Sequence, residues 1–207
     1  ERGFDPERIV KIYNGMEFNR PEGEFDRAAY LRETYGAEIE EGDVLCGIAA
    51  RLTAVKDIAT TVRGFAEALK TAPQLRLFIA GDGEDADMLK KLCDQLGVRE
   101  RVTFCGWVSP VMPFFRAMDI NLLSSVSETF PYSILEGVCA GCATICSDVG
   151  GMPELIDTGE NGYIFPVGDD KKLAEYMARL ANDAALRHTF AEALYAKASR
   201  DFSKDKM

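Results

Sequence analysis

Six short apolar segments alternate with helical patterns from residue 43 to the end of the chain, and this alternation restricts the fold more than any other feature. Between the segments, apolar residues recur at helical spacing, as at Ile58, Val62, Phe65 and Leu69. Strands that are apolar throughout and separated by helices predict a parallel sheet covered on both faces, a doubly wound, Rossmann-like α/β domain. The expected strands are DVLCGIAARL (43–52), LRLFIAG (75–81), RVTFCGW (101–107), DINLLSS (119–125), ATICSD (143–148) and GYIFPV (162–167).

The first 42 residues contain one strand-like piece, RIVKIYNG (8–15), and one amphipathic helical pattern over residues 24–36. We therefore expect residues 1–42 to be a lead-in and residues 43–207 to form the domain. The helices expected within the domain cover residues 57–72, 84–97, 110–118, 131–141, 152–157, 170–183 and 184–200.

The composition excludes several classes of partner and compartment. A formal net charge of −10 without any Lys/Arg cluster argues against nucleic acid, and no apolar run approaches the ~18 residues of a membrane span. The sequence does not indicate whether the protein associates with a membrane surface. The six cysteines lie in strand and helix patterns, which favours buried thiols, no metal and a reducing cytoplasm; they are Cys46, Cys93, Cys105, Cys139, Cys142 and Cys146.

The loops that follow the strands carry most of the unusual chemistry, and in a doubly wound sheet these loops bind the ligand. GDGEDA (81–86) fits a dinucleotide fingerprint, but the next strand supplies no acidic residue for a ribose, so a nicotinamide cofactor is not expected. Gly81 and Gly83 instead indicate a close backbone approach or a tight turn. Asp85 and Asp87 fall in a first helical turn, where the helix dipole stabilises carboxylates without a metal. His188 lies far along a C-terminal helix, which argues against a catalytic triad.

Two cations and two carboxylates in these loops are the candidate site residues. Arg51 and Lys56 flank one loop, where a guanidinium and an ammonium can clamp a diphosphate. Glu128 lies in a loop, and Glu136 lies in the following helix, whose N-terminus is suited to a phosphate or a sugar oxygen. A carboxylate such as Glu136 can accept hydrogen bonds from vicinal hydroxyls of a ribose.

Taken together and in order, the loops resemble the C-terminal, donor-binding domain of retaining group 1 (family 4) glycosyltransferases, which have two domains of the GT-B type. The segments that carry the resemblance are IYNGMEF, ARLTAVKD, LFIAGDGED, VTFCGWV, ETFPYSILE with its Glu-x7-Glu signature, and SDVGGMPELIDTGENGYIFPVGD. The resemblance implies a nucleotide-sugar donor, a UDP-, GDP- or ADP-sugar, with no cofactor and no metal. It also implies an N-terminal acceptor domain, which nothing in this chain matches.

The resemblance assigns a role to each candidate residue. Arg51 and Lys56 would hold the diphosphate, and Glu136 would hold the ribose hydroxyls. Glu128 would face the donor sugar, and the Trp107–Val108 backbone would contact the base. The segment that would approach the sugar and phosphates is Phe130, Pro131, Tyr132 and Ser133, and the turn near the donor is Gly81, Asp82 and Gly83.

The chain departs from the family pattern at a few positions, and other functions stay open. Asp57 stands where the family has glycine and adds a negative charge near the phosphate clamp; Pro131 has no N–H to offer. The alternatives are a non-catalytic nucleotide-sugar-binding module, a sugar-nucleotide epimerase, a glycoside phosphorylase and a glycoside hydrolase. The hydrolase would need Glu128 and Glu136 on either side of one bond, about 5–9.5 Å apart.

Overall fold

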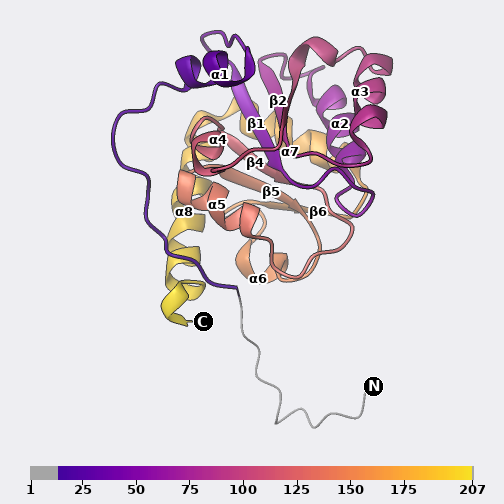
Figure 1. Ribbon diagram of the computed structural model, residues 1–207. Helices are drawn as coiled ribbons and strands as arrows, with labels where there is room; N and C mark the ends of the chain where they lie inside the picture. The colour runs from indigo at the N-terminus through magenta and orange to yellow at the C-terminus, as the bar shows by residue number, and fades with distance from the viewer. Residues whose placement is uncertain (1–13, 207) are drawn as a thin grey trace, which may run out of the picture.

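The computed structural model describes residues 14–206 and contains one sheet of six parallel strands in the order β3-β2-β1-β4-β5-β6 (Figure 1). The predicted fold class, strand number and parallel direction are therefore confirmed. The chain steps outward from β1 to β3, returns to β4 beside β1, and then steps outward the other way. The strands are β1 (Val44–Ala49), β2 (Leu75–Ala80), β3 (Val102–Gly106), β4 (Ile120–Leu123), β5 (Ala143–Ser147) and β6 (Tyr163–Phe165).

Every helix predicted from residue 57 onward is present, generally shorter at its ends than the sequence pattern suggested. The helices are α2 (Ile58–Ala68), α3 (Ala86–Gln95), α4 (Met112–Arg116), α5 (Tyr132–Ala140), α6 (Met152–Leu155), α7 (Asp170–Asn182) and α8 (Ala184–Asp201), with short 3₁₀ helices at Arg99–Arg101 and Lys204–Lys206. No helix within residues 14–206 is long and apolar enough to cross a membrane.

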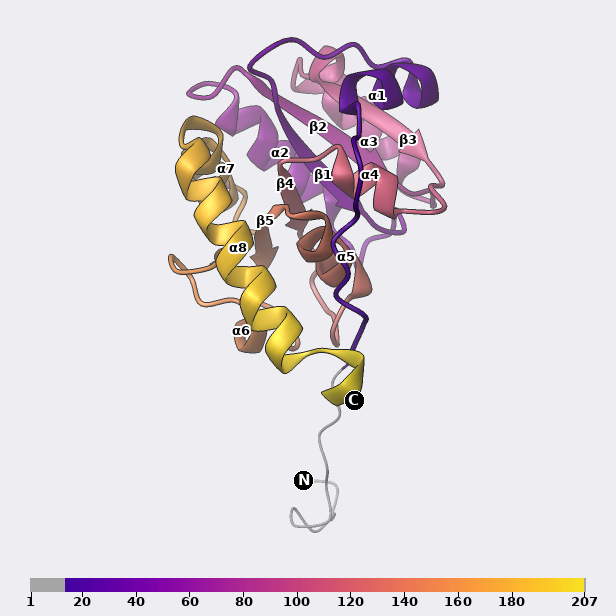
Figure 2. The same ribbon diagram turned by 90° about the vertical axis from the view of Figure 1, so that its left-hand side faces the viewer.

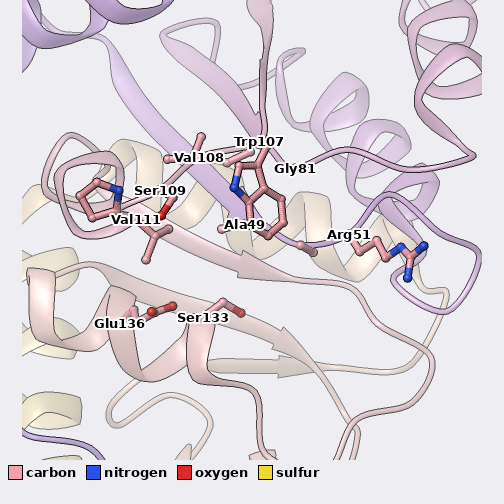
Figure 3. Close-up of a pocket in the computed structure, with 12 residues that line it drawn as sticks. Ala49, Arg51, Gly81, Trp107, Val108, Ser109, Val111, Ser133 and Glu136 are labelled. Carbon is pink, nitrogen blue, oxygen red and sulfur yellow. The ribbon is translucent and has the colours of Figure 1, made fainter.

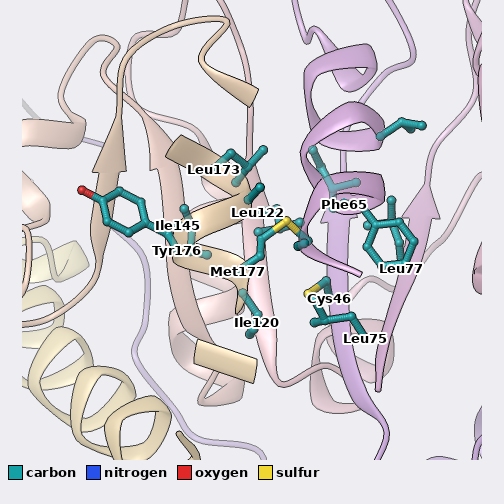
Figure 4. Close-up of a cluster of buried hydrophobic side chains, with 14 of the residues drawn as sticks. Cys46, Phe65, Leu75, Leu77, Ile120, Leu122, Ile145, Leu173, Tyr176 and Met177 are labelled. Atoms are coloured by element: carbon teal, nitrogen blue, oxygen red, sulfur yellow. The ribbon is translucent and has the colours of Figure 1, made fainter. Parts of the chain in front are cut away.

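Helices cover both faces of the sheet, so the strands are apolar along their length. On one face, Phe65 of α2 and Met177 of α7 pack over the strands (Figure 4). On the other face, Phe114 and Phe115 of α4 and Ile134 of α5 are fully buried against different strands. This two-sided burial explains why the strands do not alternate between apolar and polar residues.

The lead-in is part of the same body as the sheet. Helix α1 (Arg27–Tyr35) buries Leu31 completely, and Arg27 donates two hydrogen bonds to the carboxylate of Asp119, at 3.0 and 3.1 Å. Most of the predicted strand 8–15 lies outside the described residues. Residues 14–20 run beside α8, so the first described residues lie next to the C-terminal end of the chain (Figures 1 and 2).

Candidate functional site

The candidate site lies at the carboxyl ends of the strands, where β1 and β4 are neighbours but their following loops run in opposite directions. Such a reversal point is where open α/β sheets bind ligands. The two loops touch at their tips, because the Val126 N–H donates a 2.9 Å hydrogen bond to the Val55 carbonyl. Both valine side chains are about half exposed.

A cleft of about 500 Å³ opens beside this point. Small residues form its floor, and Ser133 and Glu136 of α5 face Trp107 and Val108 across it (Figure 3). The Trp107 side chain is 81% exposed at the rim. The lining residues are Ala49, Ala50, Arg51, Ala80, Gly81, Trp107, Val108, Ser109, Pro110, Val111, Ser133 and Glu136.

The predicted close approach at Gly81 and Gly83 is present, and the chain that approaches is the protein's own. A Cβ at Gly81 would lie 1.8 Å from the Ala50 carbonyl oxygen, and a Cβ at Gly83 would lie 2.2 Å from the Leu52 carbonyl oxygen. Hydrogen bonds from the Leu52 N–H to the Asp82 carbonyl and from the Asp85 N–H to the Leu52 carbonyl join the two loops. The two glycines therefore fix the loop that carries Arg51 and Lys56.

The cleft contains two ionisable side chains whose charged groups make no hydrogen bond or ion pair within residues 14–206. Arg51 is exposed, and its guanidinium points away from Glu136 (Figure 3). Glu136 is half-buried, and burial raises the pKa of its carboxyl above the usual value. A desolvated carboxylate without a donor is suited to accept hydrogen bonds from a bound ligand.

Lys56 and Glu128, which the sequence analysis gave separate roles, form an ion pair. The Lys56 Nζ lies 2.5 Å from the Glu128 Oε1, and the Ser125 hydroxyl donates a 2.7 Å hydrogen bond to the same oxygen. The Glu128 side chain is only 11% exposed and that of Lys56 is 26% exposed. The Ser124 hydroxyl donates to the Lys56 carbonyl, so both loops hold the pair.

The remaining predicted residues divide between the cleft and its surroundings. Phe130 is buried, Tyr132 is about half exposed at the start of α5, and Pro131 precedes the helix. Ser133 is the one residue of the segment 130–133 that lines the cleft. Asp82 is exposed, and its carboxylate accepts a hydrogen bond from the Gly83 N–H.

The Asp57 carboxylate points toward the first turn of α2. Its carboxylate accepts hydrogen bonds from the Thr60 N–H (3.3 Å) and the Thr60 hydroxyl (2.6 Å), which is an N-cap interaction. Its backbone is left-handed, with φ 43° and ψ 49°, the conformation that glycine adopts most easily. The cap therefore engages the charge that the sequence analysis placed near the phosphate clamp.

The other chemistry-bearing residues lie apart from the cleft. Asp85 and Asp87 are in the N-terminal turn of α3, and Asp87 pairs with Lys90 at 3.6 Å. No group of three or more metal-ligating residues occurs within the described range. His188 is exposed on α8. The six cysteines are free and at least partly buried, and burial raises the pKa of the Cys93 thiol to about 11.

Sequence reasoning missed the residues that support the site rather than line it. Gly150 lies under the Glu128 loop, where a Cβ would be 2.4 Å from the Glu128 carbonyl oxygen. The neighbouring Gly151 donates a 2.8 Å hydrogen bond to the Thr129 carbonyl. The adjacent glycines at 150 and 151 are a sequence signal for a close backbone approach, but only the structure shows that the approaching segment is the Glu128 loop. Ser125 gave no signal of its own.

The chain is similar to known glycosyltransferases in sequence and in structure. The family described as "Glycosyl transferases group 1" matches residues 36–197. A lipopolysaccharide core biosynthesis glycosyltransferase, LpsE of Rhizobium meliloti, is 33% identical over 139 residues, covering 67% of this chain and 41% of that protein. The N-acetyl-alpha-D-glucosaminyl L-malate synthase of Bacillus anthracis is 29% identical, covering 86% of this chain and 46% of that protein.

Solved structures of glycosyltransferases also resemble this chain. The crystal structure of Anabaena HepE in complex with UDP-glucose superposes with a TM-score of 0.85 at 26% identity, covering 97% of this chain and 55% of HepE. The C-terminal domain of the group 1 glycosyl transferase LpcC from Francisella tularensis has the same fold, with a TM-score of 0.78 at 24% identity and 100% of its chain covered. The chain thus spans about half the length of the curated relatives it matches. It belongs to the group 1 glycosyl transferases.

Proposed function

We propose that this chain is the donor-binding domain of a retaining, family 4 glycosyltransferase that takes a hexosyl group from a nucleotide-sugar. The observation that carries the proposal is the cleft in which Arg51 and Glu136 have no partner within residues 14–206, although burial disfavours the charge of Glu136. A nucleotide diphosphate supplies what both lack, because its phosphates match a guanidinium and its ribose hydroxyls match a carboxylate.

Each part of the donor has a matching part of the site. The base fits against Trp107 and Val108 at the rim, and Glu136 accepts hydrogen bonds from the ribose. Arg51 and the N-terminal turn of α5, which includes Ser133, attract the diphosphate. Glu128 faces the donor sugar, and Lys56 beside it approaches the phosphates.

The proposed chemistry is substitution at the anomeric carbon with the new bond on the same face as the old one. The bond from the anomeric carbon to the diphosphate oxygen breaks, and negative charge collects on the leaving diphosphate. An acceptor hydroxyl oxygen forms the new bond to the anomeric carbon, and its proton passes to the leaving diphosphate. Arg51 and Lys56 stabilise that charge electrostatically, so the reaction needs neither a metal nor a further cofactor.

The acceptor side of the reaction belongs to a second, N-terminal domain of a longer protein. The support is that the matches cover only 41–55% of these relatives, and that large apolar side chains are exposed beside the cleft. These side chains are Val55, Trp107, Val126 and Tyr132. The isolated chain would bind the donor without transferring the sugar. Free thiols fit a reducing compartment, so we place the protein in the cytoplasm.

Calorimetric titration with UDP, GDP, ADP and UDP-glucose tests the proposal. We expect one base to bind with a Kd of about 0.1–1 mM, because half of the cleft is missing, which corresponds to about −4 to −5.5 kcal/mol. Trp107 is the only tryptophan, so binding beside it should change the intrinsic fluorescence in parallel.

Two cleft variants and one control make the titration specific. Arg51→Ala and Glu136→Ala should each weaken binding at least about tenfold, the loss of about 1.4 kcal/mol expected for a charged hydrogen bond. Lys70→Ala removes a cation from the exposed surface of the chain just after α2, outside the cleft, and should bind like the parent chain. Equal binding by all variants, or no binding by a folded parent chain, would overturn the proposal.

A further inference from the structure

Two segments from opposite ends of the described chain meet under the loop that carries Glu128. The Met16 N–H donates to the Phe202 carbonyl at 3.3 Å, and the Lys204 N–H donates to the Met16 carbonyl at 3.0 Å. A Cβ at Gly15 would lie 2.8 Å from the Ser203 carbonyl oxygen, so the segments are in close contact. We call residues 14–16 and 202–204 the terminal clasp; both ribbon views show these ends side by side (Figures 1 and 2).

The terminal clasp holds Phe130 in two ways. The Asn14 side-chain amide donates a 2.8 Å hydrogen bond to the Phe130 carbonyl across 116 residues of sequence. The Phe202 ring stacks on the Phe130 ring, with centroids 4.9 Å apart and planes 20° apart. One contact fixes the backbone of Phe130, and the other fixes its side chain.

Gly150 and Gly151 hold the same loop from another side. A Cβ on Gly151 would lie 2.6 Å from the Phe130 ring, and a Cβ on Gly150 would meet the Glu128 carbonyl. The loop over residues 128–130 therefore fits between this glycine pair and the terminal clasp. Only Thr129 separates Phe130 from Glu128, so a displacement of Phe130 moves the Glu128 carboxylate relative to Lys56.

We propose that Asn14 and Phe202 are positioning residues, which act through Phe130 to set where the Glu128 carboxylate meets the donor sugar. This inference rests on the proposed function of the site. It predicts a selective defect. A weakened terminal clasp impairs recognition of the sugar and leaves recognition of the nucleotide intact, because no residue of the clasp is among those that line the cleft with Arg51 and Glu136.

The chain offers a matched control on the same segment. The Tyr195 hydroxyl donates a 2.8 Å hydrogen bond to the Phe18 carbonyl, which also ties residues 14–20 to the body of the protein. Asn14→Ala and Tyr195→Phe each remove one side-chain hydrogen bond to a backbone carbonyl. Only Asn14→Ala removes it from Phe130.

Titration with UDP and with UDP-glucose measures the selective defect as the ratio of the two dissociation constants. Glu128→Gln sets the reference shift in that ratio. We expect Asn14→Ala to bind UDP within about twofold of the parent chain. Its ratio of dissociation constants should differ from that of the parent at least threefold, and the change should have the same sign as the change in Glu128→Gln. Phe202→Leu should do the same, and Tyr195→Phe should leave the ratio unchanged.

Hydrogen exchange without ligand gives a second readout. The Gly151 N–H donates to the Thr129 carbonyl, so its exchange rate reports how firmly the loop is held. This rate should rise at least about tenfold in Asn14→Ala and less than twofold in Tyr195→Phe, with β2 amides unchanged in both.

The outcomes separate this inference from the proposed function. If the folded parent chain binds no nucleotide, the proposed function fails and the inference fails with it. If the parent binds and Glu128→Gln shifts the ratio, but Asn14→Ala matches Tyr195→Phe in both readouts, the inference alone is overturned. If Glu128→Gln shifts nothing, the sugar-facing role of Glu128 is wrong, and the positioning role is overturned as well.

Discussion

The two carboxylates of the Glu-x7-Glu segment lie in opposite electrostatic situations. Glu128 is almost buried, and it already has a cation and a hydroxyl on one oxygen. Glu136 is half-buried and has no partner within residues 14–206, and burial raises the pKa of its carboxyl. The two cations differ in the same way, because Lys56 is paired and Arg51 has no ion-pair partner in the described part of the chain.

On the proposed function, the contrast means that Lys56 and Glu128 are paired before the ligand binds, whereas Arg51 and Glu136 acquire their partners from the ligand. A buried charge with its partner in place resists displacement, because removing either group leaves the other uncompensated. An unpartnered charge gains from any ligand that restores its hydrogen bonds. The Lys56–Glu128 pair joins the two loops, and we propose that Arg51 and Glu136 supply affinity for the donor.

The largest expected effect comes from separating the assembled pair. Lys56→Met and Glu128→Gln should each lower the free energy of unfolding by about 1–3 kcal/mol, because each leaves a poorly solvated polar partner. The double variant should lose less than the sum, with a coupling of about 1–2 kcal/mol. Urea denaturation of the four proteins measures this cycle.

A second cycle at an exposed pair provides the control. Lys172 and Glu175 are 2.7 Å apart on the surface of α7, where solvent screens the charges. Their coupling should be far smaller than that of Lys56 and Glu128, because water and salt screen both charges. If the Lys56–Glu128 coupling is equally small, the distinction between the two halves of the site does not hold.

The sequence predicted the sheet because its evidence is local. Uninterrupted apolar segments and intervening helical periodicity specify each element within about a dozen residues, and β1 to β6 all appeared where expected. The edge of the sheet that binds the ligand could be predicted because parallel strands all end at the same edge, where open α/β sheets bind ligands. That reasoning placed Arg51 and Glu136 at this edge, and the family resemblance added Trp107 and Ser133; all four line the cleft.

Contacts between distant segments were not predictable in the same way. The Lys56–Glu128 pair depends on β1 and β4 being neighbours, a consequence of strand order that no periodicity encodes. The sequence suggested that Gly81 and Gly83 allow a close approach, but it did not identify Ala50 and Leu52 as the approaching residues. The contact of Asn14 with Phe130 gave no sequence signal at all.

The unpartnered carboxylate should make stability depend on pH in a particular direction. A raised pKa in the folded state means that the charged form of Glu136 is disfavoured by folding. Stability from this group is therefore greatest at low pH, where the carboxyl is protonated in both states. It declines as the pH rises from the usual pKa of a glutamate through the higher folded value.

Glu136→Gln removes that decline. In a series from about pH 4 to pH 7, the variant should gain stability relative to the parent as the pH passes the usual pKa of a glutamate, and the gain should level off above the folded pKa. At pH 7 the variant should be at least as stable as the parent, because only the parent has a charge to desolvate. Urea denaturation across this range gives the difference. Glu84→Gln, which changes an exposed carboxylate after β2, should leave the difference flat. A loss of stability in Glu136→Gln at pH 7 would mean that the carboxylate has a partner after all.

Asp57, which follows Lys56 and precedes α2, gives the smallest expected effect when glycine replaces it. Its left-handed backbone costs about 1–2 kcal/mol for a residue with a Cβ, and its cap to Thr60 offsets much of that cost. Asp57→Gly relieves the strain and gives up the cap, so the free energy of unfolding should stay within about 0.5 kcal/mol of the parent. Asp57→Ala gives up the cap and keeps the strain, and should lose about 1–2 kcal/mol. Because the Asp57 charge already points into α2, Asp57→Gly should also bind nucleotide within about twofold of the parent chain. A much tighter complex would instead show that this carboxylate opposes the phosphates, and that the ligand-completed half of the site extends to the start of α2.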